Sequence, residues 1–237
     1  MKRKNGDDDV FGFGQLIGIL KKNPKKIVFT EGEDPRILEA SSRLLASYFL
    51  HPILIGDEKR IADAAEESGF NIRGAEIIDP EKFDKIDEMV ELYCELRKKK
   101  GVTPDQAREV LKQANYFGTM LVKMGFADAL LGGATYSTAD TVRPALQLIK
   151  TKPGNNLVSS CFILVRPSAT GDNEVLAMGD CAININPTED DLVEIAGETA
   201  KCARIFDVDP KIAFLSYSTH GSGKGEAVDK MRNAAQK

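Results

Sequence analysis

The sequence predicts an α/β fold of two domains, in which parallel or mixed sheets are flanked by helices. From residue 26 onward, short β-rich segments alternate with amphipathic segments, which is the pattern of a parallel sheet covered by helices. A chain of 237 residues is long enough for one large domain or two modest ones. Turn formers at residues 151–156 separate two patterned regions. We therefore expect an N-terminal α/β domain over residues 1–150 and a second α/β domain over residues 151–237.

Each element of the first domain has its own local signal. Short apolar runs that end in turn formers predict strands at residues 26–30, 52–55, 76–78 and 126–131. Apolar residues at helical spacing predict helices at residues 35–49, 57–68, 82–100, 103–125 (with a break near Tyr116) and 140–149. Asp57 is placed to cap the second helix, and Thr103 followed by Pro104 is typical of a helix start.

The second domain begins with two strands, at residues 157–165 and 175–185, that could pair antiparallel around a polar loop. A helix is expected at residues 188–206, a strand at 211–217 and a last helical segment at 224–237. No further strand follows for that last helix to return to, so we expect this domain to be incomplete at its C-terminus.

Composition argues against several classes of function. The 32 basic and 36 acidic residues give a net charge of −4, so nucleic acid is not an expected partner. No apolar run approaches the roughly 20 residues that span a bilayer, and the N-terminal segment does not have the pattern of an export signal. We expect no membrane association and a cytoplasmic location. The 4 cysteines form no Cys-x-x-Cys pair, which argues against a zinc site and for thiols in a reducing compartment.

One loop carries residues well suited to bind an anion. Gly132 and Gly133 end a predicted strand, the hydroxyl residues Ser137 and Thr138 follow, and Arg143 lies in the next helix. Free backbone amides, hydroxyl donors and a planar guanidinium suit a phosphate group. A capped surface helix with a solvated arginine explains the same pattern, and the spacing alone does not choose between them.

A second loop, at residues 216–225, holds hydroxyls, glycines and one lysine between a predicted strand and a predicted helix. It is not a P-loop, because Ser218 and Gly225 stand where that motif needs a glycine and a serine or threonine. An anion-contacting loop and a flexible turn both remain open. A Cys–His nucleophile pair that uses His220 is a further alternative.

Three carboxylates follow the first predicted strand. Glu31, Glu33 and Asp34 stand at the edge where ligands of open α/β sheets bind. They could hold a divalent metal, although carboxylates at the start of a helix are the commoner explanation.

Six motifs follow one another along the chain and cover nearly everything after Lys26. They are T-E-G-E-D-P-R (30–36), P-I-L-I-G (52–56), Y-C-E-L-R-K-K-K-G (93–101), S-T-A-D-T-V-R-P-A-L-Q (137–147), G-D-C-A-I-N-I-N-P (179–187) and L-S-Y-S-T-H-G-S-G-K (215–224). In this order they resemble the phosphate acetyltransferases (phosphotransacetylases) of the phosphate acetyl/butyryl transferase family. The fourth motif favours the acetyl branch over the butyryl branch.

The resemblance implies a two-domain fold similar to that of the isocitrate and isopropylmalate dehydrogenases, with the active site between the domains and a homodimer as the usual state. It implies reversible transfer of acetyl between acetyl phosphate and coenzyme A, with coenzyme A as a substrate and with neither metal nor cofactor. By position, it assigns anion binding and catalysis to Arg97 and Arg143, and substrate binding to the loop residues Ser137, Thr138, Ser218 and Thr219.

The chain departs from the family pattern in ways that keep alternatives open. Family members usually have Pro where Thr30 stands and Lys where His220 stands. Their chains continue past Lys237 to a Ser-Arg-Gly motif and a catalytic Asp, so the family's general base has no counterpart here. A truncated, inactive fragment that binds coenzyme A or a partner subunit is therefore one alternative. A metal- and nicotinamide-dependent decarboxylating dehydrogenase is another, but it needs an Asp cluster and a cofactor loop that we do not find in the sequence.

Overall fold

The computed structural model describes residues 13–167, 173–206, 208–219 and 221–237. One compact unit spans Ile17–Lys150, and a second contains Thr151–Lys237. Across the described ranges, no helix has both the length and the apolar character needed to cross a membrane.

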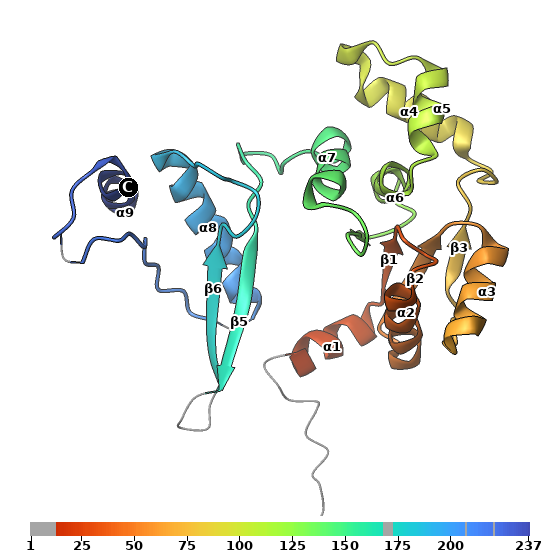
Figure 1. Ribbon diagram of the computed structural model, residues 1–237, viewed down its shortest axis with the longest axis horizontal. Helices are drawn as coiled ribbons and strands as arrows, with labels where there is room; N and C mark the ends of the chain where they lie inside the picture. The colour runs from red at the N-terminus through yellow and green to blue at the C-terminus, as the bar shows by residue number, and fades with distance from the viewer. Residues whose placement is uncertain (1–12, 168–172, 207, 220) are drawn as a thin grey trace, which may run out of the picture. The chain divides into compact units, whose positions relative to one another are not determined.

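A parallel sheet forms the centre of the unit Ile17–Lys150 (Figure 1). Its strands, in the spatial order β3-β2-β1-β4, are β1 (Lys25–Phe29), β2 (Leu50–Ile55), β3 (Glu76–Ile78) and β4 (Ala129–Leu131). All neighbouring pairs are parallel, and Ile27 of β1 lies between Pro52 of β2 and Ala129 of β4. The predicted parallel sheet is confirmed, with β4 shorter than the expected strand at residues 126–131.

Helices cover both faces of this sheet. These helices are α2 (Pro35–Ser47), α3 (Glu58–Ser68), α4 (Ile86–Leu96), α5 (Pro104–Leu111), α6 (Ala114–Lys123) and α7 (Thr138–Leu148). A further helix, α1 (Phe13–Lys22), precedes β1. Phe29 and Leu54 pack with α2 and α3 in one core, whereas Val28, Ile53 and Ile55 pack with α4 to α7 in the other. Because successive side chains of a strand point to opposite faces, an apolar run such as 53–55 fills both cores.

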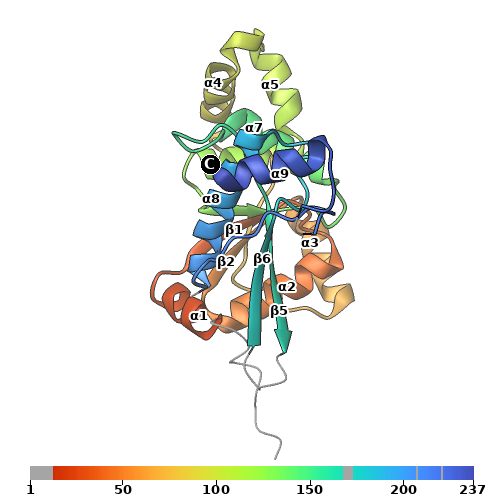
Figure 2. The same ribbon diagram turned by 90° about the vertical axis from the view of Figure 1, so that its left-hand side faces the viewer.

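Helix starts in this unit follow the local signals of the sequence. Asp57 caps α3, and Thr103 caps α5 in a capping box with Gln106, as predicted. The expected helix at 82–100 is shorter, because Lys82 lies in a turn and pairs with Asp57 and Asp79. The α4 helix ends at Leu96, and a 3₁₀ turn, η1 (Lys98–Lys100), follows it. The helix at 103–125 is broken after Leu111 and not near Tyr116, which lies within α6. The helices α4 and α5 run side by side away from the sheet (Figure 2).

The unit that contains Thr151–Lys237 is built on an antiparallel pair, β5 (Cys161–Pro167) and β6 (Asn173–Gly179), as predicted. Helix α8 (Glu189–Ile205) packs on these strands, and α9 (Glu226–Gln236) packs on α8. Among its described residues, the buried apolar side chains are Ile195, Ala200, Ala203, Val228 and Ala234.

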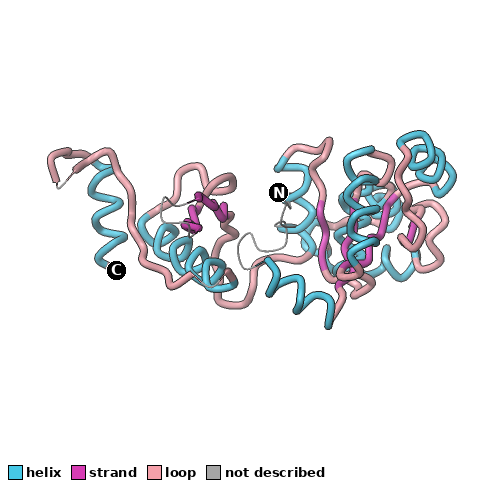
Figure 3. The backbone as a smooth tube through the Cα atoms, turned by 90° about the horizontal axis from the view of Figure 1, so that it is seen from below, coloured by secondary structure: helices cyan, strands magenta, loops and turns pink. Residues whose placement is uncertain are grey.

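The predicted strand at residues 211–217 is wrong. This stretch is irregular (Figure 3), and its Leu215 and Tyr217 are 73% and 72% exposed. Among the described residues neither β5 nor β6 pairs with it, and β propensity does not make a strand without a ladder partner. The expected strand at 175–185 also ends early, at Gly179, because Asp180 begins a turn that its own side chain holds.

Candidate functional site

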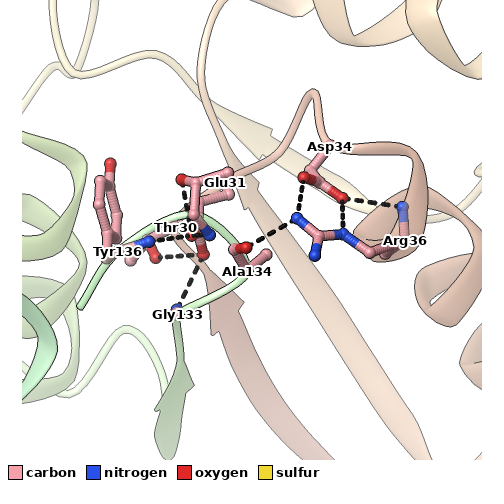
Figure 4. Close-up of polar contacts among 8 residues, drawn as sticks. Thr30, Glu31, Asp34, Arg36, Gly133, Ala134 and Tyr136 are labelled. Carbon is pink, nitrogen blue, oxygen red and sulfur yellow. Dashed lines mark hydrogen bonds and ion pairs between the residues drawn. The ribbon is translucent and has the colours of Figure 1, made fainter. Parts of the chain in front are cut away.

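Glu31 follows β1 and organises the loop that precedes α7 (Figure 4). Its Oε1 accepts hydrogen bonds from the backbone N–H of Thr135 (2.5 Å), from the Thr135 hydroxyl (3.0 Å) and from the backbone N–H of Tyr136 (3.2 Å). Its Oε2 accepts one from the N–H of Gly133 (3.1 Å). Burial acts to raise the pKa of Glu31, which is 9% exposed, but these hydrogen bonds outweigh burial and lower the pKa. The carboxylate is therefore ionised at neutral pH.

A guanidinium holds the same loop from a second direction. Arg36 Nη2 donates a hydrogen bond to the carbonyl of Ala134 (2.7 Å). Arg36 is in turn fixed by Asp34, with Nε 2.9 Å from Oδ1 and Nη2 2.7 Å from Oδ2. This hydrogen-bonded pair lowers the pKa of Asp34. The loop's N–H groups thus donate to the carboxylate of Glu31, and its Ala134 carbonyl accepts a hydrogen bond from Arg36.

The loop amides are consequently not free to bind an anion, contrary to what the glycines suggested. Ser137 is also engaged: its Oγ accepts a hydrogen bond from the N–H of Asp140 (3.2 Å) and donates one to Asp140 Oδ2 (2.6 Å). It caps α7, which begins at Thr138 and so starts earlier than predicted. Thr138 is exposed, and its hydroxyl has no hydrogen-bond partner in the described part of the chain.

Arg97 differs from the other arginines that the structure describes. It follows α4, is partly buried, and its Nε is buried without a hydrogen-bond partner. Arg143, on α7, is exposed and likewise forms no ion pair or hydrogen bond through its side chain with the described residues. A partly buried guanidinium without an acceptor is a cation left available for an anionic ligand.

The two arginines lie on neighbouring helices that are joined by side-chain contacts. Tyr93, one turn before Arg97, packs edge-on against Tyr116 of α6 with ring centroids 6.4 Å apart. The Tyr116 hydroxyl lies 3.3 Å from Oε1 of Gln147 on α7, and Gln147 is one turn after Arg143. Because residues four apart share a helix face, these contacts place the candidate arginines in one region of the unit.

A polar cavity of about 670 Å³ opens at the carboxyl ends of β1, β2 and β3. Glu31, Glu33 and Asp34 line it, but each carboxylate has its own partner. Glu33 pairs with Arg60 (2.7 Å), Asp34 pairs with Arg36, and Glu31 binds the loop amides. Asp34 thus caps the start of α2, as the commoner explanation expected, whereas Glu31 holds a loop and Glu33 pairs with an arginine of α3.

Ser218 and Thr219 belong to the other unit, in the loop before α9. The Ser218 Oγ accepts a hydrogen bond from the N–H of Gly223 (2.9 Å), and the carbonyl of Thr219 accepts one from Ser222 (3.0 Å). The Tyr217 hydroxyl donates to the carbonyl of Lys224 (3.1 Å). The loop is thus folded on itself, with Thr219 exposed. His220 lies outside the described residues.

The Asp180 carboxylate organises a turn after β6, a role that the sequence did not indicate. It accepts hydrogen bonds from the N–H groups of Ala182 (3.0 Å) and Asn184 (2.8 Å) and from both the hydroxyl and the N–H of Ser160. Burial acts against the charge, but these donors outweigh it and hold the pKa of Asp180 far below its ordinary value. An Asp before small residues is the only local signal for such a turn.

Three of the dispersed cysteines belong to the unit that contains Thr151–Lys237. Burial and a hydrogen bond with Cys202 raise the pKa of Cys161 to about 11. The Cys181 thiol lies 3.4 Å from the hydroxyl of Ser160. A thiol with a raised pKa is protonated at neutral pH, so Cys161 is a poor nucleophile.

Comparison with known proteins agrees with this α/β architecture. The family model described as "Phosphate acetyl/butaryl transferase" matches residues 13–237. A phosphate acetyltransferase of Bacillus subtilis (strain 168) is 47% identical over 211 residues, which are 89% of this chain and 64% of the relative. One from Thermoanaerobacterium thermosaccharolyticum is 44% identical over 93% of this chain and 67% of its own length. The chain belongs to the phosphate acetyl/butyryl transferase family.

Solved structures share the fold. A phosphotransacetylase from Streptococcus pyogenes matches with a TM-score of 0.84 and 46% identity, over 94% of this chain and 68% of that one. A phosphotransacetylase from Staphylococcus aureus matches with a TM-score of 0.81 and 43% identity, over 94% and 67%. The present chain thus spans about two thirds of the length of these relatives.

Proposed function

We propose that the protein is a phosphate acetyltransferase, which moves an acetyl group reversibly between acetyl phosphate and coenzyme A. The observation that carries the proposal is the partly buried, unpartnered guanidinium of Arg97 beside the helix of Arg143, in a chain of this family. Both substrates carry phosphate, which a planar guanidinium binds through paired hydrogen bonds. The relatives named above are phosphate acetyltransferases.

The chemistry follows from the two substrates. The thiolate of coenzyme A, whose parent thiol has a pKa near that of cysteine at about 8.5, attacks the acetyl carbonyl. The bond between the carbonyl carbon and the phosphate oxygen breaks, and the proton that the thiol gave up ends on the departing phosphate. Arg97 and Arg143 would stabilise the negative charge that develops on the carbonyl oxygen and the departing phosphate. Thr138 and Thr219, whose side chains are exposed, would donate hydroxyl hydrogen bonds to the substrates. Ser137 and Ser218, which are engaged with Asp140 and Gly223, would hold the two substrate loops. The reaction requires neither a metal nor a redox cofactor.

Three aspartates that could take the thiol proton are poorly suited to do so. Main-chain and lysine donors lower the pKa of Asp128, the Ser137 hydroxyl lowers that of Asp140, and the turn around Asp180 lowers its pKa further. A carboxylate with a lowered pKa is a weak base at neutral pH. Each of the three also accepts hydrogen bonds within the protein, so we assign these aspartates to structure.

Thioester formation from acetyl phosphate and coenzyme A tests the proposal, with butyryl phosphate run beside it. We expect activity with acetyl phosphate and a loss of at least about tenfold in kcat/KM for Arg97→Ala and for Arg143→Ala. Arg73→Ala is the matched control, because Arg73 is an exposed arginine of the same unit. A folded wild-type chain without activity, or arginine variants that behave like the control, would contradict the proposal.

We further propose that the protein forms a homodimer. The outer face of the β5–β6 pair supports this, since Phe162 lies opposite Met178 and Leu164 opposite Leu176, and all four side chains are exposed. A contiguous apolar surface of this kind is typical of a protein interface. Sedimentation should therefore give twice the monomer mass. Leu176→Glu should shift the protein to the monomer, and a monomeric wild type would refute this part.

The proposal has two further parts, which concern the location of the protein in the cell and the likeness of its fold to the dehydrogenases. A cytoplasmic location is supported by the cysteines, all of which are free thiols. A likeness to the isocitrate and isopropylmalate dehydrogenase fold is supported by the parallel sheet with helices on both faces. Fractionation of cells and a crystal structure of the protein with coenzyme A are the respective tests.

A further inference from the structure

The loop between β4 and α7 is held by one carboxylate from a different strand. Glu31 follows β1, and its two oxygens accept hydrogen bonds from the main-chain N–H groups of Gly133, Thr135 and Tyr136. These residues are more than 100 positions away in sequence. The Thr30 hydroxyl, at the end of the same strand, also donates a hydrogen bond to Oε2 of Glu31 (3.3 Å). All the groups that face the Glu31 oxygens can donate hydrogen bonds.

A carboxylate suits this environment in a way that an amide does not. An ionised carboxylate only accepts hydrogen bonds, whereas a glutamine has an NH₂ group at one of the two positions. With Oε1 bound by three donors and Oε2 by two, a glutamine in either orientation would place N–H groups against N–H or O–H groups. An unmade hydrogen bond at a buried site is costly, so the loop would detach on one side.

The loop runs directly into the candidate substrate residues. Tyr136 precedes Ser137, which caps α7, and Thr138 and Arg143 lie within α7. A second contact fixes α7, since the Asn115 side chain donates to the carbonyl of Asp140 (2.8 Å). The N-terminal end of α7 is therefore held by Asn115 from α6 and, through the loop, by Glu31 at three N–H groups and by Arg36 at the carbonyl of Ala134.

We propose that Glu31 is a positioning residue for acetyl transfer: its carboxylate fixes residues 133–136 and thereby places Ser137, Thr138 and Arg143 for the substrate. This inference rests on the proposed function. Glu31 touches no substrate group in this scheme, and acts only through the loop. Thr138 stands directly after the loop, whereas Arg143 lies further along α7, which Asn115 still anchors. Removal of the Glu31 carboxylate should therefore weaken the hold on acetyl phosphate more than it slows turnover of bound substrate.

Glu31→Gln is the decisive variant, and Glu33→Gln is its matched control. Glu33 is two residues away, follows the same strand, and pairs with Arg60 instead of the loop. We expect Glu31→Gln to raise KM for acetyl phosphate at least about tenfold, with kcat within about threefold of wild type. A change that only lowered the folded fraction would reduce kcat and leave KM unchanged. Glu33→Gln should match wild type.

Amide hydrogen exchange tests the same point without depending on activity. Glu31→Gln should speed exchange of the amides at 133, 135 and 136 at least about tenfold, while β1 and β2 keep their protection. Thr135→Val, which removes one donor to Oε1, should speed exchange of the same amides by about threefold. This variant replaces Glu31→Gln in the test if Glu31→Gln does not fold. Unchanged exchange in the variants overturns the inference. A wild type without acetyl transfer refutes the proposed function and with it the positioning role of Glu31. An active wild type with an unchanged KM in Glu31→Gln refutes the positioning role alone.

Discussion

The two units of the molecule use the same kinds of residues but differ in how completely those residues are buried. In Ile17–Lys150, both faces of the sheet are packed, and Val28, Leu38 and Leu54 are fully buried. Among the described residues of Thr151–Lys237, the buried apolar side chains are few and mostly small, with Ile195 the largest. The first unit has two cores because helices cover both faces of its sheet, so that the side chains on either face of each strand are packed.

The stretch at residues 211–217 shows what a missing partner does. Its sequence, K-I-A-F-L-S-Y, is as apolar as that of β1, and sequence patterning predicts a strand in both cases. Phe29 of β1 is 1% exposed, whereas Leu215 is 73% exposed. Strand formation thus depends on a neighbouring strand as much as on local propensity.

The largest expected difference between the two units is in the free energy of unfolding that is lost when one leucine of each unit is truncated to alanine. Leu54→Ala should lower the free energy of unfolding of Ile17–Lys150 by about 3 kcal/mol, because Leu54 is fully buried in the core with α2 and α3. Leu215→Ala should change stability by less than about 0.5 kcal/mol. Urea unfolding followed by circular dichroism, with hydrogen exchange to locate the affected unit, measures both. Similar losses for the two variants would mean that residues 211–217 are packed after all.

Local signals predicted the elements of the first unit well, because their causes are local. Asp57, Thr103 and the apolar runs of β1 and β2 each act within a few residues, and the elements after residue 25 form close to the predicted places. The helix α1 was not predicted. The boundaries that moved depend on distant contacts. Before α4, Lys82 pairs with Asp79, three residues earlier, and with Asp57, which is 25 residues away. The second partner lies outside any local sequence window.

The candidate site shows the same division. Sequence motifs single out Arg97 and Arg143, and the structure adds that the Arg97 Nε is buried without a partner. The opposite error arose for the glycine loop, whose amides looked free because their acceptor, Glu31, is about a hundred residues earlier. An acceptor so far away is found only when the fold is known. The same holds for the link between Ser160 and Asp180.

The second prediction concerns the most polar anchor of the second unit. Asp180→Asn should lower the free energy of unfolding of this unit by about 2 kcal/mol at neutral pH, because it replaces a charged acceptor of several N–H groups. Asp209→Asn, an exposed aspartate of the same unit, is the control. Urea unfolding at two pH values measures the difference.

The sign of the pH dependence follows from the lowered pKa of Asp180. A carboxyl group whose pKa is lower in the folded state stabilises the protein above its unfolded value of about 3.9, and this contribution is lost as the pH falls through the folded value. The gap between wild type and Asp180→Asn should therefore be full at neutral pH and shrink in strong acid. A gap that widens on acidification would contradict the assigned direction.

The smallest expected effect is the loss of a helix N-cap, which should cost the same in both units because a cap acts only on the first turn of its own helix. Thr103 in α5 and Thr188 in α8 are matched capping boxes, in which the threonine Oγ1 accepts the N–H of Gln106 (3.3 Å) and of Asp191 (3.2 Å). Thr→Ala at either cap should cost about 1 kcal/mol, which is about a fivefold faster exchange of the first-turn amides. Equal increases in the exchange rate would show that the units differ in their cores and not in how their helices are capped. A much larger factor for Thr188→Ala would show that α8 is held mainly by its cap, because the core beneath it is too small to hold it.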